Sequence, residues 1–244
     1  MNHNPPTIVS PEAWLAARRG LLQEEKELTA LRERLAARRR ALPWVKVATS
    51  YTFESPAGRV SLSDLFDGRS QLVVYHFMFG PGWEEGCKSC SYVADHLAAT
   101  VPHLQARDVS FAAVSRAPLA EIAPFKQRLG WPFTWVSSHG SDFNFDYHVS
   151  FTEEEMARGS VDYNYDRVAF PVEEAPGLSV FAKDARGDVY HTYSTYSRGL
   201  EALIGTYTVL DLVPKGRIED PEAPMSWVRY HDRYDLPAHA VATA

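Results

Sequence analysis

The chain has 244 residues, of which 45% are hydrophobic and 23% charged, a balance typical of one large folded domain or two small ones. Its formal net charge of -6 at pH 7 argues against nucleic-acid and anionic-membrane partners, because proteins that bind them concentrate Lys and Arg. The N-terminus lacks the pattern of a secretory signal, and no apolar run approaches the roughly 20 residues that span a bilayer. We therefore expect one decorated domain in the cytoplasm.

Residues 10–42 predict a long helix that forms an N-terminal extension over residues 1–43. Ser10 is a suitable N-cap, Pro11 fits the first helical position, and Pro43 stands where the helix should stop. One apolar residue recurs every seven positions, namely Trp14, Leu21, Leu28, Leu35 and Leu42. Such a narrow stripe suits packing against the main domain or pairing with a second copy in a homodimer. The cluster Arg38 to Arg40 leaves an anion site as a third option.

Residues 44–213 read as an α/β domain. Apolar runs predict strands over 45–53, 60–62, 71–79, 109–115 and 134–137, and helical patterns cover 90–104, 119–129 and 198–209. Strands that alternate with helices indicate a parallel core, whereas the strand-turn-strand pattern over 178–193 predicts a β-hairpin. An aromatic-rich insertion lies near 138–170. Residues 214–244, rich in Pro and charge, are expected to form a surface-bound tail that is partly disordered at its end.

The only two cysteines form the motif Cys87-Lys88-Ser89-Cys90, directly after the predicted strand 71–79 and before a predicted helix. At a helix N-terminus, free amides and the positive end of the dipole favour a thiolate at the first cysteine. The second cysteine is then placed to attack a mixed disulfide formed by the first. Glu84 and Glu85 oppose the thiolate and Lys88 favours it, so the sequence leaves the direction of the pKa shift open.

A β-α-β unit with the cysteine pair after its first strand, followed by a hairpin and a last helix, resembles the thioredoxin fold over roughly residues 45–210. The segment 51–66 and the strand 71–79 resemble the peroxiredoxin branch of that superfamily. The stretches HFMFGPGWEEGCKSCS, GWPFTWVSSHGSDFNFDYHVSF and PMSWVRYHDRYD resemble a bacterial family of unknown function, domain of unknown function 899. That family is described only as predicted dithiol-disulfide oxidoreductases with a thioredoxin-like fold. The resemblance specifies the fold and says little about the substrate.

The thioredoxin resemblance assigns roles to four positions. It makes Cys87 the attacking cysteine and Cys90 the resolving one. Trp83 is expected at the substrate-binding surface, although it lies four residues before Cys87 rather than directly before the pair. Pro176, which is followed by Gly177 and the predicted strand from Leu178, is the candidate for the cis-proline that faces the cysteines in thioredoxins. The implied activity is thiol-disulfide exchange with a disulfide-containing protein or a small thiol, and an external thiol reductant would recycle the dithiol.

A peroxiredoxin-like peroxidase is a weaker alternative. Peroxiredoxins carry a proline seven residues and a threonine or serine three residues before the peroxidatic cysteine, where this chain has Gly80 and Glu84. Arg116 remains a residue that could approach such a site.

A binding or assembly module without redox catalysis is the alternative from another class. Zinc needs about four ligands, so the cysteine pair would require histidines such as His76, His96 or His191. No second ligand pair stands at a diagnostic spacing, and we expect neither a metal nor a cofactor. The aromatic segments 141–148, 162–166 and 190–196 fit packing, a dimer surface or a docking groove.

Overall fold

The computed structural model describes residues 6–235 and divides the chain into two compact units, 1–43 and 44–244. The first unit is the helix α1 (Pro11–Arg40), which begins and ends within two residues of the predicted bounds. Ser10 caps it, since its hydroxyl accepts a hydrogen bond of 3.3 Å from the amide of Ala13. Three arginines in its last turn interact favourably with the negative end of the helix dipole. Packing and homodimer formation through its apolar stripe both stay predictions.

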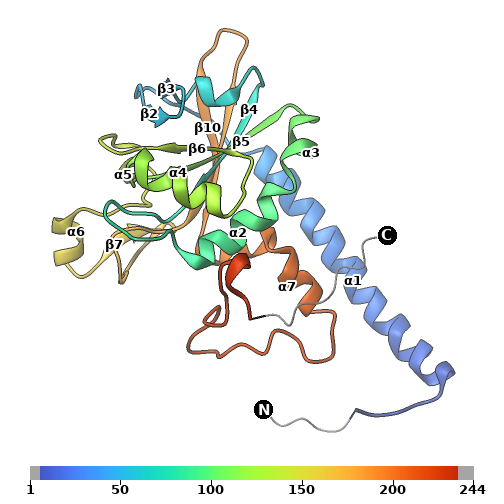
Figure 1. The fold of residues 1–244 in the computed structure, drawn as a ribbon. Helices are drawn as coiled ribbons and strands as arrows, with labels where there is room; N and C mark the ends of the chain where they lie inside the picture. The colour runs from blue at the N-terminus through green and yellow to red at the C-terminus, as the bar shows by residue number, and fades with distance from the viewer. Residues whose placement is uncertain (1–5, 236–244) are drawn as a thin grey trace, which may run out of the picture. The chain divides into compact units, whose positions relative to one another are not determined.

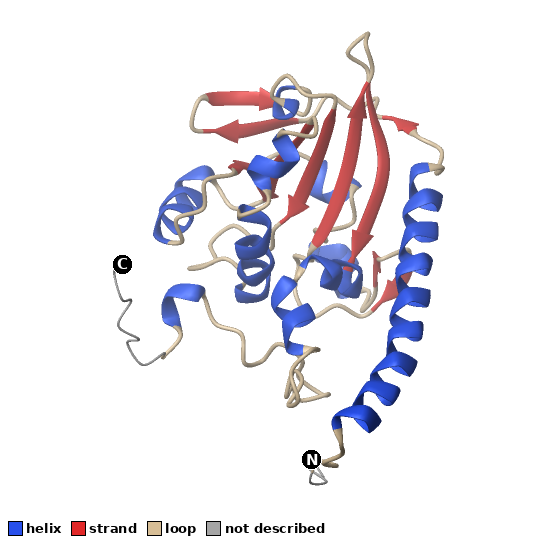
Figure 2. Ribbon diagram, turned by 90° about the vertical axis from the view of Figure 1, so that its right-hand side faces the viewer, coloured by secondary structure: helices blue, strands red, loops and turns tan. Residues whose placement is uncertain are grey.

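The second unit is built on an eight-stranded mixed sheet in the order β1-β10-β9-β4-β5-β6-β2-β3 (Figures 1 and 2). Its strands are β1 (Val45–Lys46), β2 (Thr52–Ser55), β3 (Gly58–Ser61), β4 (Gln71–His76), β5 (Val109–Ser115), β6 (Thr134–Ser137), β9 (Gly177–Lys183) and β10 (Val189–Tyr196). β4, β5 and β6 are mutually parallel, whereas β9 and β10 form the predicted antiparallel hairpin beside β4. This βαβ unit followed by a hairpin and a closing helical segment is the thioredoxin-like fold that we expected.

Helices and short turns connect these strands. They are η1 (Asp64–Phe66), α2 (Lys88–Ala98), α3 (Val101–Gln105), α4 (Leu119–Arg128), α5 (Phe143–Asp146), α6 (Glu153–Ala157), η2 (Ser197–Leu203), α7 (Gly205–Leu210) and η3 (His231–Arg233). A separate two-stranded sheet, β7 (Val161–Tyr163) with β8 (Asp166–Val168), completes the insertion.

Alternation along the strands divides the core into two clusters, one on each face of the sheet. Tyr75 and Phe77 pack with side chains of α2, α4 and α7, whereas Leu72 and Val74 pack with the α5 region. The aromatic-rich insertion supplies much of the second cluster, because Phe143, Tyr147 and Tyr163 are buried there. These aromatic rings therefore form core on the face opposite the cysteines.

Three predicted elements are divided in the structure. The expected strand 45–53 is interrupted between β1 and β2, and the expected helix 90–104 breaks into α2 and α3, with Pro102 in the first turn of α3. The closing helix is a 3₁₀ segment followed by the short α7. The tail is more than a surface segment, since Val228 is fully buried in the cluster around α2. The disorder predicted for its end falls mainly on residues 236–244, outside the described part.

Candidate functional site

Cys87 is the N-cap residue of α2, and the strand before it fixes its position. The Cys87 amide donates a hydrogen bond of 2.9 Å to the carbonyl oxygen of Met78. Gly86 lies so close to the core that a Cβ there would be 2.6 Å from the Phe77 ring. The Tyr230 hydroxyl donates a 2.7 Å hydrogen bond to the Gly86 carbonyl. The connection from β4 to α2 is therefore held from both sides, and it presents the Cys87 sulfur at a defined place.

The two cysteines are free thiols in different environments. Cys87 is half-buried, whereas Cys90 is 2% exposed. The pKa of Cys87 is lowered to about 7, chiefly because the Cys90 thiol donates a hydrogen bond to it. Burial opposes this effect, whereas the amides of Cys90 and Ser89 and the charge of Lys88 support it. Burial, with the hydrogen bond and charge of Cys87, raises the pKa of Cys90 well above its usual range. Near neutral pH, these shifts favour a thiolate at Cys87 and a protonated thiol at Cys90.

Of the two acidic residues before the motif, Glu85 has its charge compensated by arginines. Glu85 pairs with Arg128, and Arg233 also contacts it at 2.6 Å. These two arginines compensate the carboxylate charge locally and lower the pKa of Glu85 against the opposing effect of burial. The sequence left the direction of the Cys87 shift open, and in the structure the Cys90 hydrogen bond, the amides of α2 and the charge of Lys88 lower the pKa.

Tyr75 is the polar group beneath the pair. Its hydroxyl is buried and has no hydrogen-bond partner of normal geometry, an arrangement that is rare in folded proteins. Burial raises the pKa of Tyr75 well above its ordinary value, and the nearby sulfurs of Cys90 and Cys87 add to the effect. Tyr75 and Cys90 line the same cavity and belong to the same buried cluster.

A cavity of about 550 Å³ opens beside both sulfurs. Cys87, Cys90, Tyr75 and Pro176 all line it, as do residues of η2, α7 and the C-terminal segment. Figure 1 shows that segment, in orange to red, running past the N-terminal end of α2. The volume of the cavity lies in the range of about 300–1,000 Å³ that is common for small-molecule sites.

Pro176 joins the cavity in the trans form. No cis peptide bond occurs within residues 6–235, so the expectation of a cis-proline at Pro176 is wrong. The trans isomer is the default, and local hydrogen bonds hold this segment. The Ala175 amide donates a hydrogen bond of 2.8 Å to the Val149 carbonyl, and the Tyr163 hydroxyl donates one of 2.7 Å to the Pro176 carbonyl.

Two residues singled out in the sequence have partners away from the sulfurs. The Trp83 indole N–H donates a 3.0 Å hydrogen bond to Glu173, and Trp83 is not among the residues that line the cavity. Arg116 forms a 2.5 Å ion pair with the buried Glu174 and lies over the Phe145 ring. Arg116 thus has a structural partner, and a substrate-binding role for Trp83 stays a prediction.

The histidines considered for a metal site also have other partners. The His76 ring bonds to the Ser179 hydroxyl at 2.8 Å, and the His191 ring bonds to Ser194 at 2.7 Å. His96 contacts the Tyr92 carbonyl at 2.6 Å. Within residues 6–235, no three His, Cys, Asp or Glu side chains gather into a group that could hold a metal ion.

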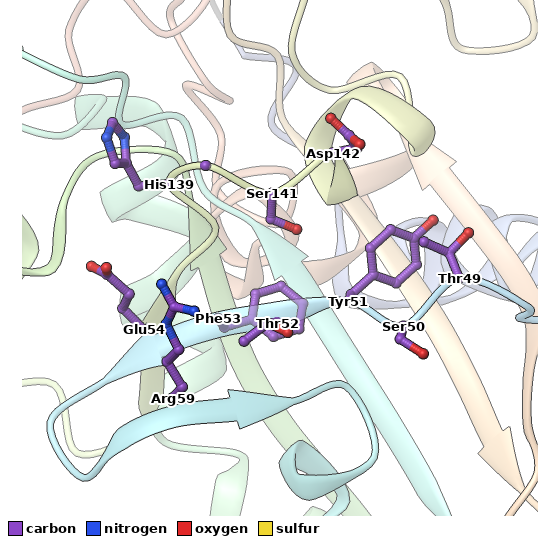
Figure 3. A pocket seen from close by; sticks show the side chains of 11 residues that line it. Thr49, Ser50, Tyr51, Thr52, Phe53, Glu54, Arg59, His139, Ser141 and Asp142 are labelled. Atoms are coloured by element: carbon purple, nitrogen blue, oxygen red, sulfur yellow. The ribbon is translucent and has the colours of Figure 1, made fainter.

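A second, smaller hollow of about 320 Å³ lies over β2 and the β6–α5 connection (Figure 3). Its lining is mainly polar and includes Glu54, Arg59 and His139, of which Glu54 and Arg59 are cross-strand neighbours. It shares no lining residue with the cysteine cavity.

The fold and the cysteine pair define a thioredoxin-like protein with a free dithiol at a helix N-terminus. The chain belongs to the family described as bacterial protein of unknown function (DUF899), whose model matches residues 3–234. No curated protein matches the chain. Among the described residues, no helix has the length and apolarity needed to cross a membrane.

Several solved structures are similar. A mutant of peroxiredoxin Q from Xanthomonas campestris is 11% identical, with a TM-score of 0.46 over 69% of this chain and 98% of that one. Peroxidoxin BcpB from Mycobacterium tuberculosis is 13% identical, with a TM-score of 0.44 over 68% and 95%. A protein described as thiol:disulfide interchange protein DsbE from Chlorobium tepidum is 16% identical, with a TM-score of 0.40 over 69% and 97%. The fold assignment rests on the strand order given above.

Sequence reasoning missed two parts of the site. In the sequence, Tyr75 looks like one more apolar residue of the strand. The only signal is that it lies two residues before Phe77 and so shares the face that α2 covers. The C-terminal segment from Arg217 to Met225 reads as a polar tail, because its contacts with the cavity are distant in sequence.

Proposed function

We propose that this protein is a thiol-disulfide oxidoreductase in which Cys87 attacks and Cys90 resolves. The observation that carries the proposal is the pairing of a half-buried, low-pKa Cys87 at the start of α2 with a buried, protonated Cys90. An adjoining cavity gives a substrate access to both sulfurs.

The exchange takes place in two steps. The Cys87 thiolate attacks one sulfur of a disulfide, forms a mixed disulfide and releases the first thiolate, which takes up a proton. Cys90 then loses its proton and attacks the Cys87 sulfur, so the second substrate thiol leaves and a Cys87–Cys90 disulfide remains. The substrate disulfide gains two electrons and the dithiol loses two. A separate thiol reductant restores the dithiol by the same chemistry in reverse.

The partners implied are a disulfide-bearing protein or small molecule and a thiol reductant. We place the reaction in the cytoplasm, where a cysteine pair spaced in this way more often serves redox chemistry than structure.

A redox titration tests the proposal. Purified protein is equilibrated with glutathione buffers, with and without chelator, and its free thiols are counted by alkylation mass. We expect a reversible two-electron couple between about -120 and -270 mV. Cys87→Ser and Cys90→Ser variants should each abolish the couple, and only Cys90→Ser should accumulate a mixed disulfide. Thiols that never cycle, or that are protected only when zinc is present, would replace the redox function with a binding role.

A further inference from the structure

The cavity beside Cys87 is walled by apolar side chains. Val93 from α2, Leu200 from η2 and Ile204 before α7 line it, together with Met78 and Met225. Leu200 and Ile204 are buried in the same cluster as Cys90, so the apolar wall continues to the sulfur pair. An apolar wall that leads to a nucleophile favours substrates whose carbon chain can leave water there.

The two arginines that line the cavity are already paired with carboxylates. Arg217 binds Glu201, contacts Asp211 at 2.7 Å and stacks on the Tyr207 ring at 4.0 Å. Arg198 contacts the same Glu201 at 3.1 Å.

The remaining carboxylates have donors of their own. Glu219 accepts hydrogen bonds from the Tyr207 hydroxyl at 2.6 Å and from the Trp227 indole at 2.7 Å. Asp220 accepts one from the Glu222 amide at 3.0 Å. The lining thus carries two arginines against three carboxylates, with each of these charges engaged within the protein.

From this lining we infer that the substrate of the Cys87 site is a small, uncharged organic disulfide with apolar substituents. The inference rests on the proposed function and names its substrate class. An anionic disulfide such as glutathione disulfide would bring carboxylates into a cavity whose arginines are already paired. Desolvation of those carboxylates would then weaken binding, because no free cation would compensate it. An alkyl disulfide exposes only C–H and sulfur surface, which the wall can cover without leaving a polar group unsatisfied. One alkyl thiol leaves when Cys87 attacks, and the second leaves when Cys90 forms the internal disulfide.

The experiment compares three disulfides of similar chain length. Reduced protein is mixed with dipropyl disulfide, 3,3′-dithiodipropionate or cystamine, and loss of its thiols is followed by alkylation mass. Each rate constant is divided by that of free 2-mercaptoethanol with the same disulfide, which removes intrinsic reactivity. We expect the corrected rate constant for dipropyl disulfide to exceed those for the dianion and the dication by about tenfold. Burial of two methylene groups is enough to produce a difference of that size.

A charge variant sharpens the test. Met225→Lys adds a cation to the cavity wall and should lower the preference for dipropyl disulfide over dithiodipropionate by about tenfold. Val209→Lys, at an exposed position of α7 outside the cavity, makes the same change in net charge and should leave the preference intact.

The outcomes separate this inference from the proposed function. Equal corrected rates for the three disulfides, or a preference for either charged one, would overturn the inference while leaving disulfide exchange in place. A reduced protein that reacts with none of them through Cys87 would overturn both. Because the wild-type preference is decisive by itself, the test does not depend on correct folding of Met225→Lys.

Discussion

Replacing Cys90 by alanine should raise the pKa of Cys87, because the Cys90 thiol makes the largest contribution to lowering it. The full change from 9.0 to about 7 corresponds to about 3 kcal/mol of preference for the thiolate. At pH 7 it changes the thiolate fraction from roughly one in a hundred to one in two. Amides of α2 and the charge of Lys88 remain in the variant, so we expect the Cys87 pKa to rise above 7 and stay below its ordinary value, with a several-fold loss of thiolate at pH 7.

The assay is the rate of Cys87 alkylation by iodoacetamide as a function of pH, identified by peptide mass. The midpoint of the profile is the relevant quantity, since the intrinsic nucleophilicity of a thiolate also changes with its pKa. Cys90→Ser is the matched control: it removes the second sulfur and keeps a hydrogen-bond donor, so its midpoint should stay below that of Cys90→Ala. A midpoint near 7 in Cys90→Ala would refute the reasoning and assign the effect to the helix N-terminus alone.

Three further predictions concern groups around this site. Tyr75→Phe should slow resolution of a Cys87 mixed disulfide several-fold, because the Tyr75 hydroxyl lowers the pKa of Cys90. The same change should raise the free energy of unfolding by about 1 kcal/mol, because this buried hydroxyl makes no hydrogen bond of normal geometry. Rapid-quench alkylation and urea titration measure the two effects, and Tyr92→Phe, which removes another buried hydroxyl without such a bond, should leave resolution unchanged. Arg116→Met should lower the free energy of unfolding by about 3–5 kcal/mol at pH 7.5 because it leaves Glu174 buried and unpaired. Burial already raises the pKa of Glu174 and favours its protonation in the folded protein, so this loss should shrink as pH falls toward 5, and an equal loss at both pH values in urea titrations would contradict it. Gly86→Ala should cost about 1–3 kcal/mol in the same titrations, whereas an unchanged midpoint would mean that the Phe77 ring can move away.

The parts of the fold that the sequence predicts well are those with strong local signals. β5 and β6 have the predicted bounds because each is a short apolar run between turn residues. α1 follows its cap and its proline. The expected helix 90–104 breaks because Pro102 fits a new first turn, a signal that was present in the sequence but outweighed by the apolar pattern.

The candidate site also has parts that local sequence predicts and parts that it does not. Local sequence is enough to place Cys87 at a helix start, because the motif and the strand before it are contiguous. Long-range packing decides the rest. Arg128 and Arg233 approach Glu85 from positions 43 and 148 residues away, and the cavity is completed by a segment more than 100 residues after the motif.

In the exchange that we propose, the difference between the two cysteines also sets the order of the two steps. In the reduced protein, the hydrogen bond and charge of Cys87 add to burial in raising the pKa of Cys90, so Cys90 stays protonated while Cys87 is free. Once Cys87 is held in a mixed disulfide, its sulfur is neutral, and both of these contributions disappear. Burial alone then opposes ionisation of Cys90, and the adjacent Tyr75 hydroxyl lowers its pKa. The pKa of the resolving thiol therefore falls at the step that requires its thiolate, and not before.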